Sequence, residues 1–202
     1  MATWHANISD EHRFVLWAPP RTGARFTFQV LQQFGLSHYS SNGEERPVPT
    51  HAITVPQHCR EYQPLLLVRN PYSRLLSLWR WQMQLRREGR QTLRHPQGFK
   101  EFYNSVAPGY MAIWPMLDKL GSDRMRLVGR STRLHLETLR EDIDRLPFVA
   151  EQQYLWPENR YASKYDRPHK ISYYTPGLLR RVAKDYAQDF MLGGYDPDAE
   201  FD

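Results

Sequence analysis

The residues near Arg21 combine charge and backbone features that suit the binding of a phosphate. Apolar residues 14–17 predict a short strand, which the two prolines at positions 19 and 20 end. Beyond them, apolar residues return at helical spacing, at Phe26, Val30, Leu31 and Phe34. Residues 21–25 therefore lie at a helix N-terminus, where free backbone N–H groups and the positive end of the helix dipole attract anions. Arg21 and Arg25 add positive charge, so we expect a ligand with a phosphate group here. A strand-to-helix turn whose arginines are only surface charge is the alternative.

A second element of the same chemistry follows the apolar residues 65–68, which predict a buried parallel strand. Arg69 ends this strand, and three polar residues then share one face of the next helix: Ser73, Arg74 and Ser77. A charge at the end of a buried strand needs a partner. An arginine fork with a serine hydroxyl suits a phosphate monoester. A salt bridge between an arginine and a carboxylate is the alternative.

Predicted strands and helices alternate along the chain. Strands are predicted for residues 14–17, 65–68 and 133–136, with further candidates at the start of 37–49 and at 51–55. The helix at 72–88 has Asn70 as its cap, Pro71 at its first position and Gly89 as its stop. Shorter helices are predicted for residues 99–104, 110–120 and 138–146. Thr175 and Pro176 begin a last helix with a single apolar stripe, made of Leu178, Val182, Tyr186 and Phe190.

This alternation predicts a three-layer αβα fold with a central, mainly parallel sheet, formed by residues 1–202 as a single domain. Ligands of such sheets bind beyond the carboxyl ends of the strands. Because Arg21 and Arg69 each follow a predicted strand, we expect both to lie at that edge.

The amino-acid composition indicates which binding partners and which cellular location to expect. A net charge of +5 and a pI near 9.4 favour an anionic partner, either a nucleotide or an acidic polymer. Cys59 is the single cysteine, which excludes an internal disulfide framework and a multi-cysteine zinc site. Residues 1–12 have no apolar core and no run is long enough to span a bilayer. We therefore expect a cytoplasmic protein without a membrane span.

Together the two anion-binding elements resemble those of the sulfotransferases that use 3′-phosphoadenosine 5′-phosphosulfate (PAPS). In that family a strand–loop–helix of the type Pro-Lys/Arg-Thr/Ser-Gly holds the 5′-phosphosulfate, in a P-loop-like manner. A later element, Arg-Asp/Asn-Pro-x-x-Arg-x-x-Ser-x-Tyr/Trp, binds the 3′-phosphate. Residues 20–26 and 69–79 match these two patterns. Residues 134–142 and the tail 173–195 are also similar, so the resemblance covers most of the chain.

The resemblance implies roles for individual residues. The loop residues that would bind the cofactor are Arg21, Thr22, Gly23, Ala24, Arg25 and Phe26, while Arg69 and Ser77 would bind the 3′-phosphate. Arg21 stands where the family often has lysine. Because arginine stays protonated near neutral pH, Arg21 would stabilise the leaving group by its charge. Ala24 replaces a hydroxyl residue common in the loop, and Arg25 can compensate for that contact.

A base must take the proton of the acceptor. The position of His51 resembles that of a histidine in one branch of the family, and its ordinary pKa suits this role. Glu45 and its neighbour Glu44 are the rivals, since other branches use a glutamate from this region. For each of them an ordinary hydrogen-bonded or solvated side chain is the alternative.

A basic segment near the family's tail closes over the nucleotide. Here it corresponds to Arg160, Lys164, Arg167 and Lys170, for which a solvated basic loop is the alternative.

The expected reaction transfers a sulfuryl group from PAPS to a hydroxyl or amine of a small-molecule, carbohydrate or lipid acceptor. Adenosine 3′,5′-bisphosphate (PAP) is the product, and neither a metal nor a specific nucleic acid is expected to take part. A kinase-like phosphotransferase is one alternative, against which stands the missing Gly-Lys-Ser/Thr ending of a nucleoside-triphosphate loop. A non-catalytic module that binds nucleic acid or another polyanion is the second, and it predicts steep dependence of binding on salt.

Overall fold

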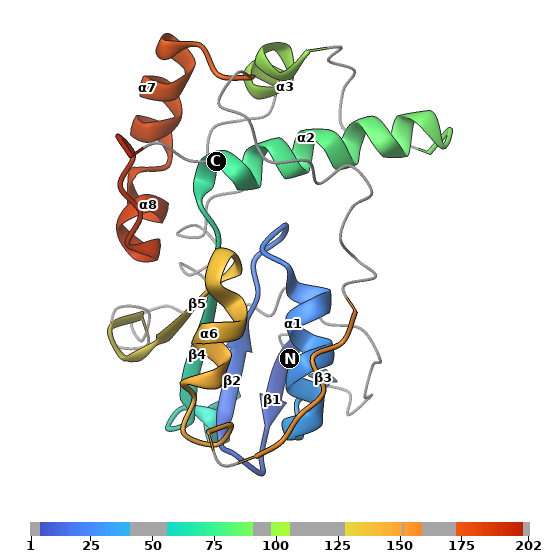
Figure 1. Cartoon of the computed structure of the whole chain (residues 1–202), viewed down its shortest axis with the longest axis vertical. Coiled ribbons are helices and arrows are strands. Elements are labelled where there is room, and N and C mark those ends of the chain that lie inside the picture. The colour runs from blue at the N-terminus through green and yellow to red at the C-terminus, as the bar shows by residue number, and fades with distance from the viewer. Residues whose placement is uncertain are drawn as a thin grey trace. The chain divides into compact units, whose positions relative to one another are not determined.

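The computed structural model describes residues 5–40, 56–90, 98–105, 128–150, 152–158 and 173–199. Contacts group the chain into two compact units, each made of two stretches of sequence (Figure 1). The first comprises Met1–Arg69 and Pro115–Tyr161, and the second comprises Asn70–Trp114 and Ala162–Asp202. The single domain expected from the sequence stays a prediction. The strand predicted at 51–55 and the helix predicted at 110–120 lie outside the described residues.

The first unit contains a five-stranded sheet in the order β3-β1-β2-β4-β5. Its strands are β1 (His5–Ser9), β2 (Phe14–Trp17), β3 (Ser37–Ser40), β4 (Gln63–Val68) and β5 (Thr132–His135). Strand β1 is antiparallel to both of its neighbours, whereas β2, β4 and β5 are mutually parallel. The other four strands therefore run in one direction. A mixed α/β fold with a mainly parallel sheet is confirmed.

Strand β1 is missing from the sequence prediction because it contains few apolar residues. Ala6 and Ile8 are buried, but between them lies Asn7, which is also fully buried. The side-chain amide of Asn7 donates a hydrogen bond to the carbonyl oxygen of Leu16 in β2, at 3.2 Å. This bond satisfies a polar group in the core, so a sequence of low hydropathy can form an inner strand.

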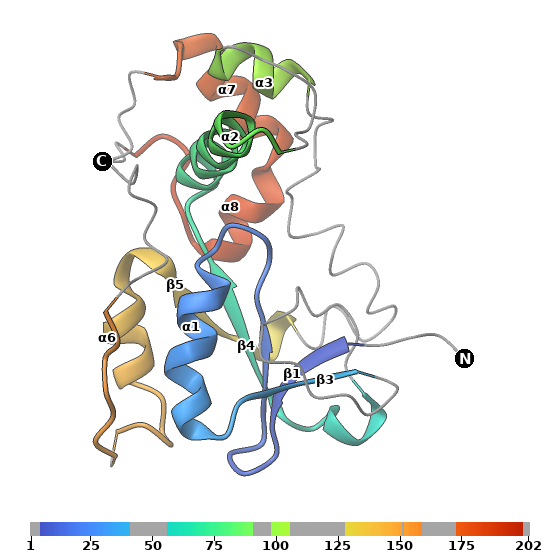
Figure 2. The ribbon, with the colours of Figure 1, turned by 90° about the vertical axis from the view of Figure 1, so that its right-hand side faces the viewer.

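Helices α1 (Ala24–Leu31) and α6 (Leu139–Asp144) lie on the same face of this sheet (Figure 2). Alternate strand residues, Leu16 in β2 and Leu65 and Leu67 in β4, join their apolar side chains to the core under these helices. Between β5 and α6 runs the 3₁₀ turn η4 (Leu136–Thr138). The described elements of this unit form one helical layer, and the third layer expected from the sequence is not among them.

The second unit is helical and has an aromatic core. It contains α2 (Pro71–Arg87), α3 (Phe99–Ser105), α7 (Pro176–Asp185) and α8 (Ala187–Gly193). The caps of α2 are confirmed, since the Asn70 side chain accepts a hydrogen bond from the Tyr72 backbone N–H at 3.0 Å and Gly89 has a positive φ. Edge-to-face contacts hold the core, as between Tyr72 and Phe190, whose ring centroids are 5.0 Å apart.

The prediction of one continuous C-terminal helix is wrong, because the chain breaks at Tyr186 into α7 and α8. Thr175 does cap α7, accepting from the Leu178 backbone N–H at 3.3 Å. The Tyr186 backbone N–H still bonds to the Val182 carbonyl and its own carbonyl accepts from Phe190. The apolar spacing of four residues therefore continues through the break, which hides it in the sequence. None of the described helices is long and apolar enough to cross a membrane.

Candidate functional site

The loop between β2 and α1 has a backbone suited to holding an anion. Arg21 and Gly23 both have positive φ, at 64° and 87°. Gly23 is the N-cap of α1, and no side chain caps this end of the helix. Left-handed residues in such a turn aim successive N–H groups into one concavity, and the helix dipole adds to the attraction. The loop predicted from the sequence thus combines two left-handed residues with a helix N-terminus that has no side-chain cap.

Gly23 is required for two reasons. Its left-handed φ is strained for residues with a side chain. A Cβ at this position would also lie 2.5 Å from the Cδ1 atom of Leu136. Leu136 directly follows β5, so this contact packs the loop against the carboxyl end of a strand two places away in the sheet.

Three of the predicted loop residues have buried side chains, which shape the loop: Thr22, Ala24 and Phe26. The Thr22 hydroxyl donates to the Pro19 carbonyl at 2.6 Å. Its one proton is thus used within the loop, and a phosphate would meet Thr22 through the backbone N–H. The ring of Phe26 packs edge-on against Trp156, with centroids 5.2 Å apart. Arg21 is half-buried and Arg25 is exposed, so these two side chains can reach a ligand.

Arg69 braces the loop from the end of β4. Its Nη1 atom donates a hydrogen bond to the Arg21 carbonyl oxygen at 3.2 Å, and Arg69 is 9% exposed. Strands β2 and β4 are parallel neighbours, so Arg21 and Arg69 follow their carboxyl ends at the same edge. The structure therefore brings these two predicted site residues together. It also explains how a charge at the end of a buried strand is satisfied, namely by a backbone carbonyl.

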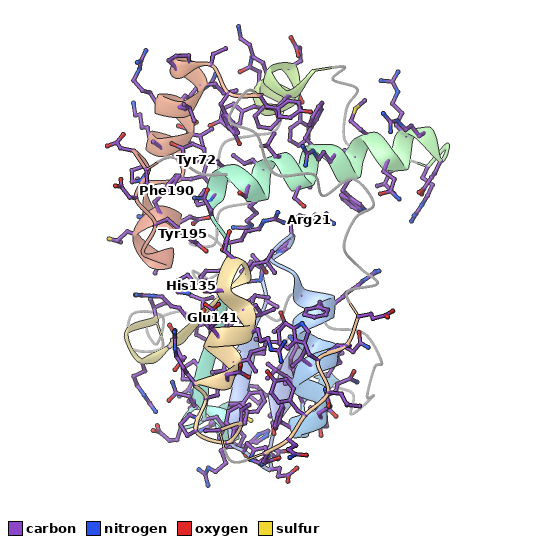
Figure 3. The ribbon with its side chains drawn as sticks, in the orientation of Figure 1. Arg21, Tyr72, His135, Glu141, Phe190 and Tyr195 are labelled. Carbon is purple, nitrogen blue, oxygen red and sulfur yellow. The ribbon has the colours of Figure 1, made fainter. Side chains whose placement is uncertain are left out.

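A histidine that sequence reasoning did not single out lies at the same edge. His135 ends β5, where it pairs with Val68, the residue before Arg69. Asp142 Oδ2 lies 2.8 Å from His135 Nδ1 and accepts a hydrogen bond from the His135 backbone N–H at 2.7 Å. The carboxylate thereby fixes the orientation of the ring. Figure 3 shows Arg21 on the loop and His135 at the end of β5.

In the second unit, the polar residues of α2 have a different setting from the predicted one. Ser73, Arg74 and Ser77 are all buried. Arg74 Nη1 lies 3.2 Å from Asp189 Oδ2 on α8, and both side chains are only 2% exposed. Arg74 thus has a carboxylate partner, which is the salt bridge that the sequence left open as an alternative for an arginine of this element. A phosphate contact of Ser77, which is 2% exposed, stays a prediction.

Several predicted site residues lie outside the described part of the chain. They are the candidate bases His51, Glu44 and Glu45, and the basic residues Arg160, Lys164, Arg167 and Lys170. Their roles stay predictions.

No protein-family model, curated protein or solved structure matches this chain. The site must therefore be interpreted from its own chemistry. That chemistry is an uncapped helix N-terminus, three arginines and an oriented imidazole, all belonging to the first unit.

The histidine and its carboxylate have a weak signal in the sequence. A polar residue that ends a predicted strand is a candidate site residue in a parallel sheet, because ligands bind at that edge. His135 sits one residue before the predicted end of strand 133–136, and Asp142 lies in the following predicted helix. The sequence does not show that the two side chains meet, since this depends on how the chain turns through η4.

Proposed function

We propose that this protein is a PAPS-dependent sulfotransferase with a three-layer αβα fold and a P-loop-like loop that holds the 5′-phosphosulfate. The loop would bind the phosphosulfate through backbone N–H groups and through Arg21 and Arg25. Arg69 and Ser77 would bind the 3′-phosphate. Support comes from the resemblance of residues 20–26 and 69–79, and from the position of the loop beyond the carboxyl end of β2.

The observation that carries this proposal is the hydrogen bond from Arg69 to the Arg21 carbonyl. It joins the two sequence elements that the resemblance identifies, and it is made by the backbone carbonyl of a loop residue with left-handed φ. Donors that are already in place do not have to reorganise when charge develops on the ligand. A loop of this kind suits a reaction whose leaving group is a phosphate.

In the proposed reaction, an oxygen or nitrogen atom of the acceptor attacks sulfur and forms a new bond to it. The bond between sulfur and the bridging oxygen breaks, and the electron pair stays on the 5′-phosphate of PAP. Arg21 and the loop N–H groups stabilise that negative charge. The acceptor proton passes to a base, for which His51 and Glu45 are candidates from the sequence. His135, oriented by Asp142, is a third candidate from the described residues.

The test is thermal melting of the full chain with adenosine 3′,5′-bisphosphate, compared with ATP and Mg²⁺. At a hundredfold excess over its Kd, the bisphosphate should add roughly 2.7 kcal/mol to the free energy of unfolding. A shift with ATP and Mg²⁺ but none with the bisphosphate would support a phosphotransferase. Strongly salt-dependent stabilisation by oligonucleotides alone would support a polyanion-binding module. Either result contradicts the proposal.

A sulfotransferase assay with the same protein identifies the base. Replacement of the true base should abolish sulfuryl transfer and leave the shift with the bisphosphate intact.

A further inference from the structure

Three side chains with metal-binding atoms meet at the edge of the sheet opposite the loop. Asp10 lies in the turn between β1 and β2, whereas His58 and Cys59 lie in the 3₁₀ helix η2 (Gln57–Cys59), shortly before β4. The carboxylate oxygen, the ring nitrogen and Sγ all lie within 4.8 Å of one another. Both segments precede strands β2 and β4, at the lower end of the sheet in Figure 1. We propose that Asp10, His58 and Cys59 form a binding site for Zn²⁺ or a cation of similar chemistry.

The three ligand types favour zinc over the hard cations. Zinc binds thiolate, imidazole and carboxylate with bonds of about 2.0 to 2.3 Å. A tetrahedron of that size separates its ligand atoms by about 3.5 Å, so the observed distances, which are at most 4.8 Å, have to shorten by no more than about 1.3 Å. Magnesium and calcium prefer oxygen ligands alone and would gain little from the sulfur and the nitrogen.

The burial of the three residues indicates where the ion would lie. Cys59 is 1% exposed, whereas Asp10 and His58 are exposed. The ion would therefore bind at the surface, with the thiolate on its inner side. With three protein ligands, the fourth position faces solvent and would be taken by water.

Neighbouring contacts hold the ligands near this geometry. The Tyr62 hydroxyl donates a hydrogen bond to Asp10 Oδ1 at 2.8 Å, which orients the carboxylate and directs binding to Oδ2. The Gln63 backbone N–H donates to the Arg13 carbonyl at 2.8 Å and thereby joins the two segments that supply the ligands. Within η2, the Cys59 backbone N–H bonds to the Pro56 carbonyl at 3.0 Å.

A reactive thiol is the main alternative use of Cys59. Burial, with a smaller contribution from the charge of Asp10, raises the pKa of Cys59 to about 11. A raised pKa is unfavourable for a nucleophilic thiol. Binding of a divalent cation would replace the thiol proton by a bond from sulfur to the metal and release that proton to solvent.

The decisive probe is Co²⁺, because bonding of a thiolate to cobalt produces a charge-transfer absorption band. Cys59 is the only cysteine of the chain, so such a band can come from no other residue. We expect the full chain to show the band with Co²⁺ and to lose it on addition of Zn²⁺. In Cys59→Ser the band should be absent, and Kd for Zn²⁺, measured by calorimetry, should rise by more than about tenfold. Glu11→Gln, a neutralised carboxylate one residue away in the same turn, is the matched control and should keep both properties.

His58→Ala gives an independent test that does not alter the core, because His58 is exposed. It should raise Kd by more than about tenfold as well, and Tyr62→Phe by about tenfold, since Tyr62 acts through Asp10. Absence of the band in the unaltered protein overturns the proposal. Unchanged Zn²⁺ affinity in His58→Ala also overturns it, because the ion would then be held elsewhere. The inference does not depend on the sulfotransferase proposal, and bisphosphate binding should be the same in Cys59→Ser.

Discussion

Arg69 and Arg74 lie five residues apart in one sequence element, yet they have different partners. Arg69 follows β4 in the first unit and donates to the backbone carbonyl of Arg21. Arg74 lies inside α2 in the second unit and pairs with the carboxylate of Asp189. A carboxylate cancels the charge of an arginine, whereas a carbonyl oxygen accepts its hydrogen bond and leaves the charge in place. The two arginines of this element thus contact different kinds of acceptor.

The difference shows how far a motif determines the role of its residues. An arginine that is removed from water must find a partner, and the residues that the fold brings near it decide which one. In α8 that partner is acidic, and the result is a buried ion pair within the helical unit. At the end of β4 it is a loop backbone, and the result is a hydrogen bond that joins the strand end to the loop.

The largest effect is expected from breaking the buried pair. Asp189→Ala removes the carboxylate that lies against the buried Arg74 and should lower the free energy of unfolding by about 3 to 5 kcal/mol, measured by urea denaturation. The double variant Arg74→Met with Asp189→Leu removes both charges and should recover most of this loss. A loss below about 1 kcal/mol in the single variant would show that the pair does not stabilise this unit.

Arg69→Ala should have its main effect on binding. The stabilisation by excess bisphosphate, roughly 2.7 kcal/mol at a hundredfold excess over Kd, should disappear. The ligand-free protein should lose only about 1 to 3 kcal/mol, the contribution of one charged hydrogen bond. Arg69→Lys, which keeps the charge without the planar fork, should retain part of the shift in thermal melting. An undiminished shift in Arg69→Ala would make Arg69 a structural residue like Arg74.

The smallest effect on stability is expected at the two arginines with positive φ, Arg21 at 64° and Arg13 at 51°. Replacement by glycine relieves the strain of the left-handed backbone and adds freedom to the unfolded chain. We therefore expect Arg21→Gly and Arg13→Gly each to change stability by less than about 1 kcal/mol. Only Arg21→Gly should weaken bisphosphate binding in calorimetry, because Arg13 lies at the other edge of the sheet. If both variants weakened bisphosphate binding equally, Arg21 would contribute only to the overall positive charge of the protein and would not contact the ligand.

The parts of the fold that the sequence predicts well have strong local signals. Strand β2 has the predicted bounds, and the apolar run at 65–68 lies within β4. Helix α2 follows its Asn70 cap and its proline as expected. Strand β1 and the break at Tyr186 were missed because neither has a local signature. A buried asparagine forms the middle of β1, and the apolar stripe passes through the break unchanged.

At the candidate sites, the sequence predicted the residues that directly follow strands. It did not predict contacts between side chains of distant segments. Arg21 and Arg69 meet as expected, since parallel neighbouring strands bring their carboxyl ends together. The single cysteine excludes a zinc site with several cysteines, but it does not exclude a site in which one cysteine is joined by other residue types. The proximity of Asp10 to His58 and Cys59 depends on the turn after β1 and on η2, about 50 residues apart in the chain.

The sequence by itself determined the mixed α/β class, the loop between β2 and α1 and the arginine at the end of β4. These follow from hydrophobic periodicity, helix caps and the two prolines, which act over a few neighbouring residues. Only the tertiary structure decided that Arg74 pairs with Asp189, that Asp142 orients His135 and that Asp10 meets the His58 and Cys59 side chains of η2. Each of these depends on which remote segment supplies a partner for a desolvated polar group, and local propensity contains no information on that choice.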